Sequence, residues 1–85
     1  MIRVDIKDYQ EAVPLLQAHK LDEFIVAIHK DGLDYIVDIL ATDQTIVYRL
    51  TNPEPYVDMA DAIANVKIFL QDFKAFVFEG TLQDV

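Results

Sequence analysis

The sequence contains no cysteine and no serine among its 85 residues. It therefore cannot form disulfides or a thiolate metal site, and it lacks the two commonest hydroxyl and thiol nucleophiles of enzymes. The two histidines, His19 and His29, stand ten residues apart and outside any metal-binding helix motif. We expect no metal ion, no cofactor and no catalytic activity.

Long hydrophobic runs are also missing. The start of the chain alternates apolar and charged residues, unlike a secretory signal, and no apolar run approaches the roughly 20 residues of a membrane span. Two glycines and three prolines leave no room for a flexible linker. The sequence predicts a single compact domain over residues 1–85, located in the cytoplasm and not in a membrane.

Basic residues are few: 7 Lys and Arg oppose 15 Asp and Glu, which gives a formal net charge of -8. Because such a chain repels phosphate backbones, we expect no direct binding of nucleic acid. The hydrophobic fraction of 53% is high for so small a domain, whose interior is limited. Part of this apolar surface should lie at an interface.

The hydrophobic pattern predicts strands and helices in a definite order. Residues 2–6 alternate as a half-buried strand does, and Asp8 with Glu11 indicates a helix start, although Pro14 could move that start to Gln10 or later. Asp58 is the expected N-cap of a second helix, and residues 75–78 suit a final strand.

A hairpin over residues 24–40 is the strongest local signal. Asp31-Gly32 between two alternating apolar runs predicts a two-residue turn, with His29 opposite Asp34. Phe24, Val26 and Ile28 would then face the core with alternate residues of the second strand. A third strand follows over residues 45–50, after a turn around Asp43.

The predicted fold is an α+β two-layer sandwich. Its order is strand-helix-strand-strand-strand-helix-strand, with a mostly antiparallel sheet and both helices on one face. The outer face should carry a cluster of four polar residues: His29, Asp34, Asp38 and Arg49. Such a cluster could take part in acid–base catalysis, or it could be an ordinary cross-strand group of charges on a solvated face. The absence of a nucleophile or phosphate-binding loop favours the second interpretation.

Eleven of the fifteen acidic residues are aspartates, many of them at turns and helix starts. This is either ordinary turn and capping chemistry or an acidic face that occupies a basic, nucleic-acid-handling surface of another protein. In the second interpretation, the acids that bind the partner are Asp31, Asp34, Asp38, Asp43, Asp58, Asp61 and Asp72, and the apolar anchors are Ile25, Ile36, Val47 and Ile68.

The hairpin segment from Phe24 to Val37, FIVAIHKDGLDYIV, and the helix segment from Asp58 to Asn65, DMADAIAN, resemble the β-β-β-α-β core of the HicB-type antitoxins. The resemblance covers about half of the chain. The sequence lacks that family's proline- and glycine-containing segment after the second strand, adds a strand and a helix in front, and has no DNA-binding domain. The resemblance implies an acidic inhibitor of a basic toxin, and phage inhibitors of nucleic-acid enzymes match the same charge and size.

The resulting hypothesis is a non-catalytic, acidic interaction domain that inhibits or sequesters a basic protein, such as a nuclease or another nucleic-acid-binding protein. The alternative is a structural or accessory domain that forms a homodimer through the outer sheet face.

Overall fold

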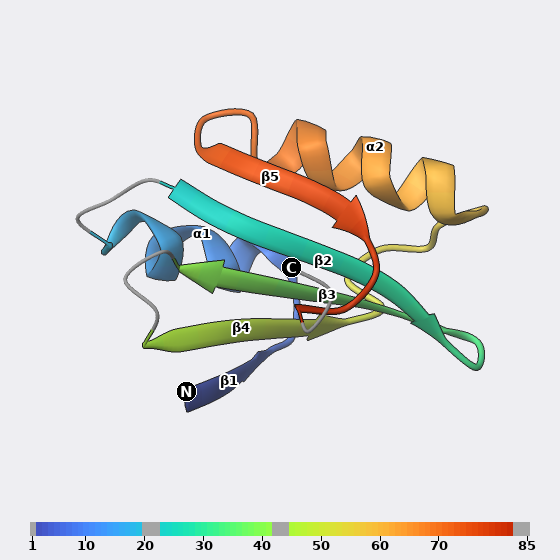
Figure 1. Cartoon of the computed structure of the whole chain (residues 1–85), viewed down its shortest axis with the longest axis horizontal. Coiled ribbons are helices and arrows are strands. Elements are labelled where there is room, and N and C mark those ends of the chain that lie inside the picture. Colours follow the sequence, from blue (N-terminus) through green and yellow to red (C-terminus); the bar gives the residue numbers. More distant parts are fainter. Residues whose placement is uncertain (1, 20–22, 42–44, 83–85) are drawn as a thin grey trace.

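The computed structural model describes residues 2–19, 23–41 and 45–82. Figure 1 shows one sheet with two helices behind it. The elements in chain order are β1 (Ile2–Ile6), α1 (Tyr9–Gln17), β2 (Glu23–Asp31), β3 (Asp34–Ala41), β4 (Ile46–Thr51), α2 (Met59–Phe69) and β5 (Lys74–Glu79). This confirms the predicted α+β class, the order of the elements and the placement of both helices on one face.

The sheet has the strand order β1-β4-β3-β2-β5. The central pairings β2–β3 and β3–β4 are antiparallel, whereas the edge pairings β1–β4 and β2–β5 are parallel. The sheet is thus mixed, with more parallel pairing than the sequence suggested, because each helix returns the chain before the next strand joins. As a result, β1, β2, β4 and β5 all run in one direction and β3 runs in the other.

Both helices begin at the predicted aspartates. The Glu11 amide donates to the Asp8 carboxylate at 3.0 Å, and the Asp61 amide donates to the Asp58 carboxylate at 2.8 Å. α1 therefore starts at Tyr9 and contains Pro14, so the possible later start is wrong. Pro14 removes one backbone hydrogen bond. Burial of Tyr9, Ala12 and Leu16 against the sheet stabilises the helix despite that loss.

The core lies between the helices and one face of the sheet. Alternate strand residues supply it, as the hydrophobic pattern predicted, and α2 adds Ala62 and Val66. The largest fully buried side chains are Phe24, Leu16, Ile28, Ile39, Leu50, Leu70, Val26, Val37 and Val66.

The hairpin between β2 and β3 has a different register from the predicted one. Asp31 pairs with Asp34, and His29 pairs with Ile36, so the two turn residues are Gly32 and Leu33. Gly32 has a φ of +63°, which glycine adopts readily as the first central residue of a hairpin turn. The predicted pairing of His29 with Asp34 is wrong, but the partner shifts by two positions, so every residue keeps its face.

The outer sheet face is partly covered by the chain itself. After β5 the chain turns back across β2 and β3 (Figure 1), and the Gly80 amide donates to the Ile28 carbonyl at 2.8 Å. Thr81 and Leu82 then line the same hollow as Val47 and Arg49. This cover buries part of the surface that alternation alone predicts to be exposed.

Candidate protein-interaction surface

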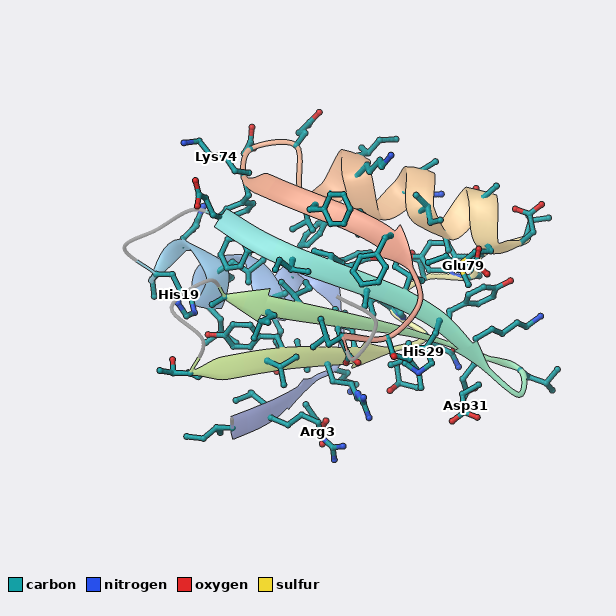
Figure 2. The ribbon with its side chains drawn as sticks, viewed as in Figure 1. Arg3, His19, His29, Asp31, Lys74 and Glu79 are labelled. Atoms are coloured by element: carbon teal, nitrogen blue, oxygen red, sulfur yellow. The ribbon has the colours of Figure 1, made fainter. Side chains whose placement is uncertain are left out.

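The strand directions give the molecule two chemically different ends. β1, β2, β4 and β5 finish at one end, where α1 and α2 also begin. We call this the acidic end, because it gathers the carboxylates of Asp8, Glu11, Asp31, Asp34, Glu54, Asp58, Asp61 and Glu79. Its basic side chains in the described part of the chain are Lys7 and Lys30. In Figure 2, Asp31 and Glu79 lie toward this end, and Lys74 and His19 lie toward the other.

Within the described residues, the carboxylates of the acidic end form no ion pair with a side-chain cation, although the charge of Asp31 contributes to the raised pKa of Arg49. Within residues 2–19, 23–41 and 45–82, the ion pairs join Arg3 to Asp5, Arg49 to Asp38 and Lys74 to Glu23, all outside this end. The Lys30 ammonium lies over the Tyr35 ring, 5.3 Å from its centroid. The acidic end therefore keeps a negative potential that can attract a basic surface.

At the hairpin tip, Asp31 and Asp34 stand directly opposite each other. Like charges in this position destabilise a hairpin. Asn52 of the following loop donates to the Asp34 carboxylate at 2.7 Å and accepts from the Tyr35 amide at 2.7 Å. It does so with a φ of 50°, in the left-handed region that asparagine tolerates better than most residues. These two hydrogen bonds connect the loop before α2 to the tip of the β2–β3 hairpin.

The aspartates at the start of α2 accept hydrogen bonds from neighbouring residues of the chain. One Asp61 oxygen accepts from the Val57 amide at 2.9 Å, and the other accepts from the Asn65 side chain at 2.9 Å. Asp58 caps the same turn. Both aspartates have structural tasks, yet each remains without a cationic partner among the described side chains.

Two apolar side chains stand exposed among these acids: Leu33 at the hairpin tip is 92% exposed and Val57 before α2 is 87% exposed. Ile68, which is 64% exposed, lies in the last turn of α2 beside Lys67, where it lines a hollow together with Glu54. Leu33 and Val57 were not among the predicted anchors, although an apolar residue at a turn tip or just before an N-cap has little core to enter. Exposed apolar anchors surrounded by charge are typical of binding surfaces.

Two hollows flank the segment from Pro53 to Tyr56. One, of about 300 Å³, lies between Tyr9, Tyr56, Ile68 and Phe69, and the other, of about 450 Å³, lies between Leu33, Tyr35 and Asn52. Glu54, Pro55 and Tyr56 line both. Aromatic walls beside a carboxylate suit the aliphatic stem and charged head of a lysine or arginine.

The tyrosines beneath this surface form one connected cluster. Tyr9 stacks on Phe69 with ring centroids 4.0 Å apart, its hydroxyl is hydrogen-bonded to that of Tyr56, and Tyr56 packs edge-on against Tyr35. Burial raises the pKa of Tyr9, and so do the hydrogen bond to Tyr56 and the charge of Glu54. Burial also raises the pKa of Tyr56. Both hydroxyls therefore stay neutral and hold the segment from Pro53 to Tyr56 in place.

The outer-face residues do not join the acidic end. Asp38 is 4% exposed and accepts two hydrogen bonds from Arg49, at 2.8 and 2.9 Å. The hydrogen bond that Arg49 donates to Asp38 raises the pKa of Arg49. Ile36 and Val47 are 8% and 9% exposed, and Ile25 is half-buried. Three of these predicted contact residues are therefore buried, while Ile68 is exposed.

The predicted His29 cluster is only partly assembled. His29 lines a hollow with Asp38 and Arg49, but Asp34 lies at the hairpin tip, opposite Asp31. The His29 Nδ1 atom is buried and has no hydrogen-bond partner among the described residues. The Asp38 carboxylate is already occupied by Arg49.

The last two predicted aspartates fall elsewhere. Asp72 is exposed in the turn between α2 and β5, at the opposite end from Asp31. Asp43 lies outside the described residues. Of the predicted acids, the fold brings together Asp31, Asp34, Asp58 and Asp61, and it adds Glu54 and Glu79 to them.

No helix in the described part of the chain is both long enough and apolar enough to cross a membrane. The described residues also contain no group of three histidine, aspartate or glutamate side chains placed to hold a metal ion.

Comparison of the chain with protein-family models, with curated proteins and with solved structures found no match.

Proposed function

We propose that this chain is a non-catalytic interaction domain that inhibits or sequesters a basic, nucleic-acid-handling protein through its acidic end. The observation that supports the proposal is the gathering of carboxylates that form no ion pair within the described residues around the exposed side chains of Leu33 and Val57. A basic partner would be steered by the charge and held by the apolar anchors. The domain would thus occupy a surface that otherwise binds phosphates, in the manner of a nucleic-acid mimic.

The hollows beside the segment from Pro53 to Tyr56 support the same function. Each offers Glu54 and an aromatic wall, which together fit a basic side chain of the partner. A partner of this kind and the net charge of -8 are compatible with a cytoplasmic inhibitor of the antitoxin or phage type. Dimerisation through the outer sheet face is less favoured, because Ile36 and Val47 are buried in the single chain.

A charge-reversal pair tests the proposal. Asp31→Lys with Glu54→Lys reverses two carboxylates of the acidic end, and Glu23→Lys with Asp72→Lys makes the same net change at the opposite end. The wild type and both variants are used as baits with a lysate of the source cells, and bound proteins are eluted with increasing salt. We expect a basic protein to be captured by the wild type and the Glu23/Asp72 variant, lost from the Asp31/Glu54 variant, and eluted by salt.

The captured protein is then mixed with nucleic acid and the domain. The proposal expects the domain to displace the nucleic acid in an electrophoretic mobility assay. Equal capture by both double variants would show that the acidic end does not select the partner. Binding that leaves the nucleic acid in place would contradict the inhibitory role.

A further inference from the structure

The two edges of the sheet are protected to different degrees. β1 carries the ion-paired charges of Arg3 and Asp5 within the strand. β5 has its charges, Lys74 and Glu79, only at its two ends, and its interior is Ala75-Phe76-Val77-Phe78 without charge, proline or glycine. An uninterrupted apolar edge strand is a template for pairing with another strand, whereas charges within a strand discourage it.

Aromatic surface lies along the unprotected edge. Phe76 is 65% exposed and stacks on Phe78, with ring centroids 5.7 Å apart. Both point to the outer face, opposite to Ala75 and Val77, which pack against the core. A shallow hollow of about 430 Å³ beside Phe76 is lined by Glu23, Phe24, Lys74 and Ala75. This edge thus combines the outward backbone groups of a terminal strand with an aromatic pair, of which Phe76 is exposed and Phe78 is half-buried.

We propose that β5 pairs antiparallel with β5 of a second copy of this chain, so that two five-stranded sheets join into one. Pairing about Val77 sets Phe76 of each copy opposite Phe78 of the other. The four rings would then form a single apolar patch on the outer face. The dimer would be isologous, with its twofold axis passing between the two Val77 residues.

The charges at the two ends of β5 favour a second copy of this chain in the antiparallel orientation. Antiparallel pairing brings the Lys74 end of each strand to the Glu79 end of the other, whereas parallel pairing would bring like charges together. Glu79 lies at the acidic end and Lys74 at the opposite end (Figure 2). In an antiparallel pair the two acidic ends would therefore point away from each other. The repulsion expected from a net charge of -8 per chain is thereby reduced.

The dimer is tested by sedimentation equilibrium of the full chain from micromolar to millimolar concentration. We expect a mass that rises toward twice 9.7 kDa with concentration. Phe76→Lys places a charge on the exposed edge and should give the single-chain mass throughout. Ile2→Lys adds the same charge at an equally exposed apolar side chain on β1, the other edge of the sheet, and its mass should match that of the wild type.

Hydrogen exchange of the wild type gives a second readout that needs no variant. Backbone amides of residues 75–79 should exchange more slowly as concentration rises, while those of β1 should not change. A single-chain mass over the whole range would overturn the proposal. A dimer that survives Phe76→Lys, or that leaves the exchange of β5 unchanged, would assign self-association to another surface. Neither result bears on the acidic end, whose tests use separate variants.

Discussion

Asp38 and Asp31 are the same residue type on neighbouring strands, yet their surroundings are opposite. Asp38 is buried on the outer face and is held by two hydrogen bonds from Arg49. Asp31 is exposed at the hairpin tip, opposite another carboxylate, and makes no ion pair among the described residues, although its charge contributes to the raised pKa of Arg49. A buried charge needs its partner to remain folded, whereas an exposed unpaired charge is free to meet another molecule. The two regions thus separate acids that maintain the fold from acids available for binding.

The largest effect is expected from breaking the buried pair. Arg49→Ala leaves the Asp38 carboxylate buried without a counter-charge, which should lower the free energy of unfolding by about 3 kcal/mol or more. Arg49→Lys keeps the charge but not the two-point contact, so its loss should be smaller. Denaturant titration measures both. A loss below about 0.5 kcal/mol for Arg49→Ala would place this pair with ordinary surface ion pairs.

The tyrosines beneath the acidic end should make the fold sensitive to alkali. The pKa values of Tyr9 and Tyr56 are raised in the folded protein, while unfolded tyrosines titrate near pH 10. Above that pH the folded state holds protons that the unfolded chain has lost. Stability is therefore intact below pH 10 and falls above it, with a slope of up to about 1.4 kcal/mol per pH unit from Tyr9 and a smaller one from the more exposed Tyr56.

Tyr9→Phe separates this effect from general alkaline unfolding. The variant has one tyrosine fewer to titrate, so its stability should fall less steeply with pH in thermal melts above pH 10. The same slope for the variant and the wild type would mean that Tyr9 does not resist ionisation in the folded state.

The capping aspartates should show an intermediate effect. Asp58→Ala removes the hydrogen bond to the Asp61 amide at the start of α2, with an expected cost of about 1 kcal/mol. Asp58→Asn keeps a capping oxygen and should cost less. Both variants remove the same negative charge, so the difference between their free energies of unfolding in urea titration measures the contribution of the capping hydrogen bond. Equal losses would attribute the effect to charge alone.

The smallest effect on stability is expected at the hairpin tip. Asp31→Asn removes one of two opposed carboxylates, so the free energy of unfolding should rise slightly, by no more than about 0.5 kcal/mol. The gain should shrink as salt is added, because exposed charges are screened. A clear loss of stability would show that Asp31 also has a structural task, and it would weaken the contrast with Asp38.

Local patterns in the sequence were sufficient for the architecture. The caps at Asp8 and Asp58 and the alternation in the strands predict the elements and their faces, because these depend on neighbours along the chain. The hairpin register was predicted wrongly, since Asp31-Gly32 and Gly32-Leu33 are both compatible with a glycine turn. The predicted faces of the two strands were nevertheless correct, because a register shift of two positions leaves each residue on the same side of the sheet.

The binding surface was less accessible to prediction. Alternation placed Ile36, Asp38 and Val47 on the outer face, but it could not show that the chain after β5 returns across that face. The convergence of Asp31 and Asp58 at one end depends on strand directions in the whole sheet, and these are set by long-range pairing. Leu33 and Val57 were not predicted as anchors, because the predicted anchors lay on the outer sheet face and on the second helix, and not at the turn tip or before the N-cap.

The first turns of the two helices have an electrostatic consequence for the aspartates that precede them. The backbone of each helix carries a partial positive charge of about half a unit at its first turn, beside Asp8 in α1 and beside Asp58 in α2. This charge comes from peptide dipoles, and the amides of Glu11 and Asp61 bring it to one oxygen of each capping aspartate. The fold therefore stabilises these two carboxylates without the side chain of a lysine or arginine.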